Sequence, residues 1–76
     1  MEYILVTLKM PQQTDMDLKI PWFISGEAFL QIMRKITGSS ISVASKIQAE
    51  PLGRILDNSH SFFDEGVGNG ALLTVL

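Results

Sequence analysis

Residues 25–38 read SGEAFLQIMRKITG, and this stretch predicts an amphipathic helix over residues 26–37. Ser25 can cap its first turn, because the serine hydroxyl can accept a backbone N–H that has no partner inside the helix. Gly38 follows as a residue that can adopt the left-handed conformation that ends many helices. Between these caps, four apolar residues recur at the spacing of one helix face and are expected to point into a core: Phe29, Ile32, Met33 and Ile36.

Apolar and alternating segments on both sides of this helix predict short strands. We expect them over residues 3–9, 16–20, 46–50, 54–56 and 71–76. The order β-β-α-β-β-β predicts an α+β fold of the β-grasp (ubiquitin-like) type, in which one helix packs on a four- to five-stranded mixed sheet. The first and last strands are the most apolar, so we expect them to be central and parallel. The short third and fourth strands should then lie to one side.

The remaining segments are expected to be connections. Residues 39–45 should join the helix to the third strand, and residues 57–68 should form a loop with one helical turn near residues 62–65. Phe62 should be buried in this loop and Phe63 partly exposed. The predicted core has twelve members: Ile4, Val6, Leu18, Ile20, Phe29, Ile32, Ile36, Ile47, Leu56, Val67, Leu73 and Val75.

Composition limits the classes of function. The 76 residues are expected to form a single domain over residues 1–76, and 46% hydrophobic residues argue against a disordered chain. The six basic residues form no stripe, which argues against nucleic acid as a partner. The chain has no cysteine, so a disulfide or a thiolate metal site is excluded. We see no signal peptide and no apolar run of about 18 residues, so direct membrane insertion is not expected.

Two motifs could suggest chemistry. His60 lies among Asp57, Ser59 and Ser61, but a catalytic triad needs side chains that converge from separate positions beside an oxyanion hole. The repeated glycines over residues 66–70 resemble a dinucleotide loop, yet a strand and not a helix should follow them. We therefore expect the segment around His60 to form a solvated turn and residues 66–70 to form a tight turn. We expect no catalytic, cofactor-binding or metal-binding residue.

The outer face of the sheet is the candidate site. Strand alternation should turn Tyr3 and Leu5 away from the helix, together with Leu72 and Leu76 of the last strand. Such exposed apolar residues would form one protein-interaction patch, because contiguous apolar surface commonly marks a partner site. The alternative is that central strands are simply apolar and that these side chains are scattered. They could also support a weak homodimer.

Trp22 and Phe23, just before the helix, are the second candidate. They could cap the open end of the core, which we favour. They could instead stand out as an aromatic anchor for a partner, since tryptophan is enriched in binding hot spots.

Three stretches carry a family resemblance: YILVTL (3–8), MDLKIP (16–21) and FFDEGVGNGALLTVL (62–76). Over nearly its whole length the chain resembles the YukD/EsaB-like ubiquitin-fold proteins of bacterial type VII secretion systems. The resemblance implies a non-enzymatic, cytoplasmic accessory or regulatory component of the secretion machinery. Its implied partner is a cytoplasmic domain of a secretion membrane component or of the motor ATPase, and this partner could recruit the chain to the inner face of the membrane.

The resemblance also implies that the chain is not conjugated to targets. Ubiquitin-type modifiers and sulfur carriers need a flexible Gly-Gly end, whereas this sequence ends at Leu76, in or just after the last strand. The alternative is a ubiquitin-like modifier or sulfur-carrier protein whose C-terminal tail is missing here. A ligand-binding β-grasp domain or a small enzyme is a third alternative, but no cluster of polar residues supports it.

Overall fold

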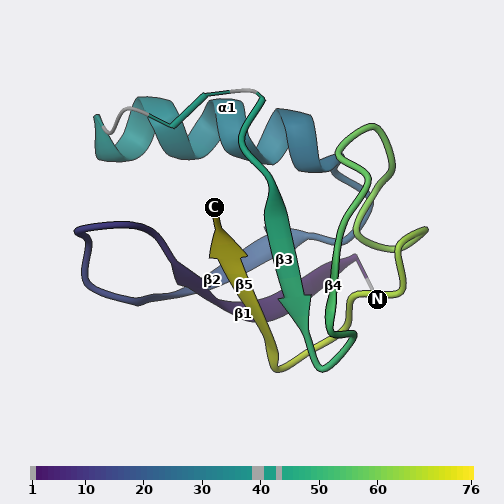
Figure 1. Ribbon diagram of the computed structural model, residues 1–76. Coiled ribbons are helices and arrows are strands. Elements are labelled where there is room, and N and C mark those ends of the chain that lie inside the picture. Colours follow the sequence, from purple (N-terminus) through teal and green to yellow (C-terminus); the bar gives the residue numbers. More distant parts are fainter. Residues whose placement is uncertain (1, 39–40, 43) are drawn as a thin grey trace.

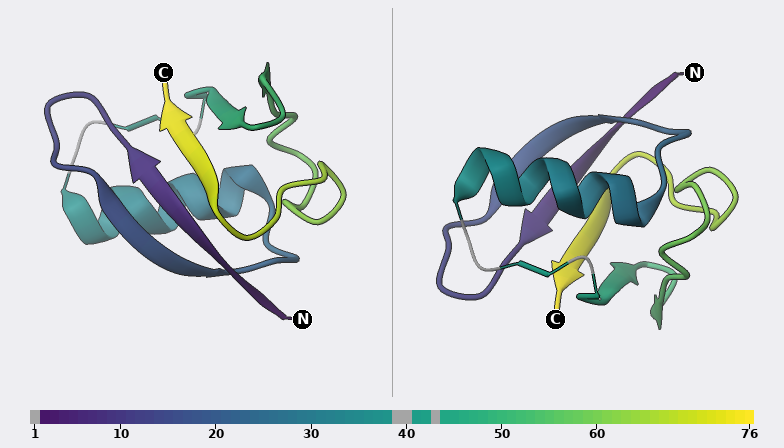
Figure 2. Two further views of the ribbon diagram at one scale, coloured as in Figure 1. Left: turned by 90° about the horizontal axis from the view of Figure 1, so that it is seen from below. Right: turned by 90° about the horizontal axis from the view of Figure 1, so that it is seen from above.

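The computed structural model describes residues 2–38, 41–42 and 44–76. Its sheet has the strand order β2-β1-β5-β3-β4, and one helix crosses one face of that sheet (Figures 1 and 2). This confirms the predicted β-grasp fold with five strands. The elements along the chain are β1 (Tyr3–Lys9), β2 (Met16–Pro21), α1 (Gly26–Thr37), β3 (Ile47–Glu50), β4 (Arg54–Ile55) and β5 (Ala71–Val75).

The two central strands are parallel, as the sequence predicts. Val6 of β1 lies opposite Ala71 of β5, and Leu8 lies opposite Leu73. β2 pairs with β1 antiparallel and forms one edge of the sheet. β3 pairs antiparallel with β5, and the short β4 follows at the other edge. Of the predicted connector over residues 39–45, residues 39–40 and 43 lie outside the described residues.

The helix ends are capped as the sequence predicts. The Ser25 hydroxyl accepts a hydrogen bond from the Ala28 N–H at 3.1 Å. Gly38 has a φ of 64°, and its N–H donates to the Arg34 carbonyl at 3.1 Å. Each cap satisfies a backbone group that the helix itself leaves without a partner.

The predicted inward face of the helix is partly wrong. Phe29 and Met33 are buried, but Ile32 is exposed and Ile36 is 70% exposed, while Leu30 is fully buried instead. The buried stripe therefore runs along Gly26, Phe29, Leu30 and Met33. Both stripes have helical spacing and share two residues, so periodicity alone could not choose between them.

The first turn of α1 explains this rotation. The Gly26 N–H donates to the His60 carbonyl at 3.2 Å, and the Glu27 N–H donates to the Asn58 carbonyl at 2.9 Å. A Cβ at Gly26 would lie 2.9 Å from Asn58 Oδ1, so the helix rests directly on the loop after β4. Leu30 follows Gly26 by four residues and lies on the same buried face of the helix, whereas Ile32 does not.

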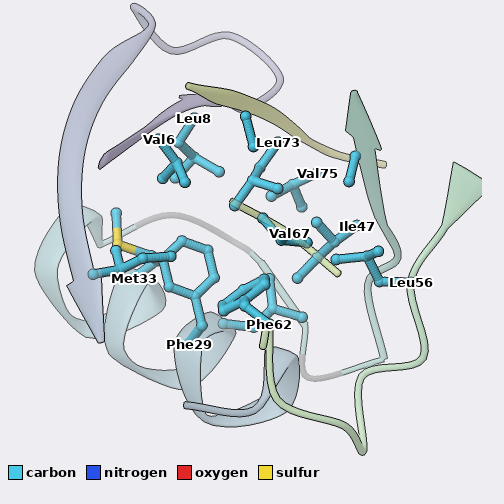
Figure 3. Packing of buried hydrophobic residues seen from close by; sticks show 14 of the residues in the cluster. Val6, Leu8, Phe29, Met33, Ile47, Leu56, Phe62, Val67, Leu73 and Val75 are labelled. Atoms are coloured by element: carbon cyan, nitrogen blue, oxygen red, sulfur yellow. The ribbon is translucent and has the colours of Figure 1, made fainter. Parts of the chain in front are cut away.

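The core lies between the helix and the sheet (Figure 3). Phe29 and Phe62 meet edge to face, with ring centroids 5.4 Å apart. Leu18 is only half-buried, since it lies on the edge strand β2, but it still packs against the core. The other predicted core residues are confirmed as buried: Ile4, Val6, Ile20, Phe29, Ile47, Leu56, Val67, Leu73 and Val75.

Candidate functional site

Leu5 lies on β1, on the outer face of the sheet. The alternation of β1 buries Ile4 and Val6 and leaves Leu5 60% exposed. Leu72 lies opposite Thr7, which makes it a diagonal neighbour of Leu5 across the β1–β5 pair. Tyr3, also exposed, lies two residues from Leu5 on the same face. We call Tyr3, Leu5 and the half-buried Leu72 the Leu5 patch.

Leu76 does not belong to this patch. With Thr7 opposite Leu72, Tyr3 lies four residues before that pair on β1, and Leu76 lies four residues after it on the parallel chain. At about 3.3 Å per residue, roughly 26 Å of strand separates Tyr3 from Leu76. The single patch expected from alternation is therefore divided, because alternation sets the face of a residue and register sets its position along the strand.

Two hollows flank Leu5. One is about 480 Å³ and is lined by Leu5, Val6, Thr7, Asp17, Leu18, Lys19 and Gly70. The other is about 420 Å³ and is lined by Glu2, Tyr3, Ile4, Leu5, Lys19 and Asn69. Both contain Leu5 and Lys19, which face each other across the β1–β2 pair. These two side chains therefore form a ridge between two shallow depressions.

Polar contacts hold the surroundings of the patch. Asn69 Oδ1 accepts from the Leu5 N–H at 2.8 Å, and the Gly70 N–H donates to the Leu5 carbonyl at 2.8 Å. Lys19 Nζ lies 5.2 Å from the centroid of the Tyr3 ring, in cation–π geometry. The result is an apolar centre with a polar rim, which is the usual composition of a protein interface.

The two residues of the second candidate differ: Trp22 covers the end of the core, whereas Phe23 is exposed. Trp22 is half-buried, packs against the core, and donates from Nε1 to the Val67 carbonyl at 2.7 Å. Phe23 is 61% exposed. Phe63 is 46% exposed, in line with the expected partial exposure. It also joins Trp22 and Phe23, which no feature of the sequence had indicated. Its ring centroid lies 4.8 Å from that of Trp22 and 5.0 Å from that of Phe23, although it is 40 residues away along the chain. We call these three residues the aromatic cluster.

His60 takes part in a network centred on Glu65. His60 Nδ1 lies 2.9 Å from Glu65 Oε2, and Arg54 Nη1 donates to Glu65 Oε1 at 2.8 Å. The Asp57 N–H donates to the same Oε1 at 2.9 Å, and that bond, followed by those from Arg54 and His60, lowers the pKa of Glu65 from 4.5 to about 2. In turn, the hydrogen bond to Glu65 raises the pKa of His60 above 6.5.

This network ties the loop together and shows no arrangement for nucleophilic catalysis. The Ser59 hydroxyl donates to Asp57 Oδ1 at 2.6 Å, and this bond is the main cause that lowers the pKa of Asp57. A catalytic serine would instead donate to the histidine. Within the described residues, no group of three or more His, Asp or Glu side chains is placed to hold a metal ion. The only helix found in the same residues is too short to cross a membrane.

Comparison with known proteins supports the fold. The chain is similar to the ubiquitin-like domain of an Arabidopsis thaliana protein, with a TM-score of 0.79 and 14% identity over 100% of this chain and 78% of that one. It is also similar to the C-terminal ubiquitin-like domain of mouse tubulin-specific chaperone e (TM-score 0.77, 15% identity, 97% of this chain and 84% of that one). A third similar structure is the ubiquitin-like domain of Plasmodium falciparum Dsk2 (TM-score 0.66, 21% identity, 97% and 99%). No family model matches the chain, and no curated protein matches it by sequence.

Proposed function

We propose that the chain is a non-enzymatic protein-interaction module that binds its partner through the Leu5 patch. The observation that carries this proposal is the 60% exposure of Leu5 on the outer face of the sheet, between two hollows that share it. The ubiquitin-like fold supports it, because domains of this fold present a rigid sheet face on which a partner can be seated. Function still depends on the site and not on the fold alone.

The energetics of the patch favour binding. Burying a leucine side chain completely contributes about 1.5–3 kcal/mol, before the entropy cost of association is subtracted. Leu5 and Leu72 lie on the two central strands, and the backbone of Leu5 is fixed on both sides by Asn69 and Gly70. A partner therefore gains this contribution without ordering the surface that it binds.

The more specific part of the proposal concerns the system in which the chain works. The resemblance of residues 3–8, 16–21 and 62–76 to YukD/EsaB-like proteins supports a cytosolic accessory component of a type VII secretion system, one that acts without conjugation. The partner would then be a cytoplasmic domain of the secretion membrane component or of its ATPase. The exposed leucines give such a domain an apolar surface to cover.

A pair of matched variants tests the surface. Leu5→Asp places a charge at the centre of the patch, and Leu76→Asp makes the same change at an exposed leucine outside it. We expect purified secretion ATPase or membrane-component domains to bind the parent and Leu76→Asp, and to lose at least ten-fold in affinity for Leu5→Asp. Both variants should melt within a few degrees of the parent, since neither residue is part of the core.

Equal binding by Leu5→Asp would rule out the patch as the interface. Failure of all secretion components to bind the parent would rule out the proposed system. Recovery of the native chain in covalent adducts, detected by intact-mass spectrometry, would instead identify a modifier.

A further inference from the structure

Asn69 and Gly70 form the turn that leads into β5. The Ala71 N–H donates to the Gly68 carbonyl at 3.2 Å and closes this turn. Gly70 has a φ of 83°, which a type II turn requires at its third position and which glycine adopts at no steric cost. Both Asn69 and Gly70 are exposed to solvent. The turn therefore combines an exposed carboxamide with a following backbone nitrogen that no side chain shields.

An asparagine followed by glycine can react with its own backbone, which is one reason why asparagine is a thermolabile residue. The Gly70 nitrogen loses its proton and attacks Cγ of the Asn69 carboxamide. The new N–Cγ bond closes a five-membered succinimide ring, and the carboxamide nitrogen leaves as ammonia. Water then opens the ring at one of its two carbonyls and leaves either an aspartate or an isoaspartate, whose main chain passes through the former side chain. Water is the only co-reactant, and nothing is oxidised or reduced.

The fold holds both reacting groups in hydrogen bonds to one residue, Leu5. The Gly70 N–H donates to the Leu5 carbonyl at 2.8 Å, which opposes the loss of the proton that must precede attack. Asn69 Oδ1 accepts from the Leu5 N–H at 2.8 Å, which fixes the carboxamide against the backbone of β1. The carboxamide carbon therefore cannot swing toward the Gly70 nitrogen until the contacts with Leu5 break.

The backbone of the turn opposes ring closure as well. In a type II turn, the second residue, here Asn69, has a ψ of about +120°. The ring closes only when rotation about the Cα–C bond of Asn69 brings the Gly70 nitrogen to the same side as Cβ. That rotation would separate the Ala71 N–H from the Gly68 carbonyl, which the turn joins. The reaction therefore needs an opening of the turn together with its release from β1.

We infer that Asn69 is a deamidation site that the fold keeps closed and that reacts when the turn before β5 separates from β1. Native chains open locally as well as globally, and each opening of this contact exposes the pair to the reaction. The change is one-way, because an isoaspartate adds one atom to the main chain within the turn. The two hydrogen bonds to Leu5 then cannot both form again. Each modified molecule therefore keeps a record of one opening of the β1–β5 contact.

Ageing the full chain at pH 8, folded in buffer and unfolded in guanidinium chloride, tests the inference. Proteolysis followed by mass spectrometry measures the conversion at each asparagine. We expect Asn69 to convert at least ten-fold faster in the unfolded chain than in the folded one. Asn58, the only other asparagine of the sequence, is an internal control, because the side chain of Ser59 hinders attack by its nitrogen. It should convert more slowly than Asn69 in the unfolded chain, and Asn69→Gln should remove the conversion at that position.

Amide hydrogen exchange gives a second measurement, because exchange and ring closure both begin with the loss of the Gly70 proton. In the folded chain, the Leu5 and Gly70 amides should exchange at least ten-fold more slowly than in the unfolded chain. Equal conversion of Asn69 in both states, its persistence in the unfolded chain, or an unprotected Gly70 amide would overturn the inference. A purified isoaspartyl chain in which both amides regain their protection would refute the one-way character of the change.

Discussion

Replacing Glu65 with glutamine should destabilise the domain far more than a typical substitution outside the core. The Glu65 side chain is only 10% exposed and accepts hydrogen bonds from the Asp57 N–H and from Arg54, with His60 on its other oxygen. Arg54 Nη2 also donates to the Glu65 carbonyl at 2.6 Å. Glutamine keeps the size of the side chain but removes its charge and turns one acceptor into a donor that faces other donors.

The lowered pKa of Glu65 sets the size of this effect. A fall from 4.5 to about 2 corresponds to roughly 3.5 kcal/mol, at about 1.4 kcal/mol for each pKa unit. Arg54 and His60 are each about half exposed, so solvent screening reduces the contribution, and we expect about 1–2 kcal/mol at pH 7. Because the folded pKa is the lower one, this stability is complete above about pH 4.5 and is lost as the pH falls toward 2.

Urea unfolding followed by Trp22 fluorescence measures the effect. At pH 7 we expect Glu65→Gln to unfold at lower urea and to melt roughly 5–15 °C lower. At pH 2 the difference from the parent should shrink below about 0.5 kcal/mol, since the carboxyl is then about half protonated in the folded parent and almost fully protonated in the unfolded chain. Asp64→Asn, at an exposed carboxylate next in the chain, is the control and should stay within about 0.5 kcal/mol. A Glu65→Gln variant as stable as the parent at pH 7, or a difference that does not narrow in acid, would refute the reasoning.

Three further predictions follow from the same structure. Phe29→Ala should cost about 3–5 kcal/mol in urea unfolding, whereas Ile36→Ala should cost under about 0.5 kcal/mol; similar costs would contradict the observed rotation of the helix. Trp22→Phe should cost about 1–2 kcal/mol, because it leaves the carbonyl bonded to the indole N–H without that donor; an unchanged urea midpoint would contradict this. The raised pKa of His60, followed by NMR titration, should fall toward 6.5 in Glu65→Gln. The part of the stability that the His60–Glu65 pair provides should be lost as the pH rises through the folded His60 pKa.

The sequence was sufficient for the fold because its signals are local and agree with one another. The Ser25 and Gly38 caps fix the helix ends: Ser25 forms the predicted hydrogen bond and Gly38 adopts the predicted left-handed conformation. The apolar first and last strands indicated the central parallel pair, since the most buried strands of a sheet are the most apolar. None of these inferences needed the register between elements.

The sequence was insufficient wherever a distance between elements decides the outcome. The register of β1 against β5 separates Leu76 from Tyr3, although alternation correctly turns Leu5 outward. Two helical stripes are equally periodic in the sequence, and the buried one is the stripe that contains Gly26, which packs against Asn58 in the loop after β4. Phe63 reaches Trp22 only because the chain folds back after β4, and no spacing of residues in the sequence predicts that contact.

The 57–66 loop connects the core with the aromatic cluster. Phe62 and Phe63 are adjacent, yet one is fully buried against Phe29 and the other stands in the aromatic cluster. Such a reversal requires a fixed backbone, and the helical turn closed by the bond from the Glu65 N–H to the Ser61 carbonyl provides it. The Glu65 carboxylate then binds that turn to Arg54 at the sheet edge, so the residue that stabilises the loop also positions the exposed rings. A substitution that loosens this loop should therefore also disturb the aromatic cluster, whereas the Leu5 patch, which the central strands support, should keep its shape as long as the domain stays folded.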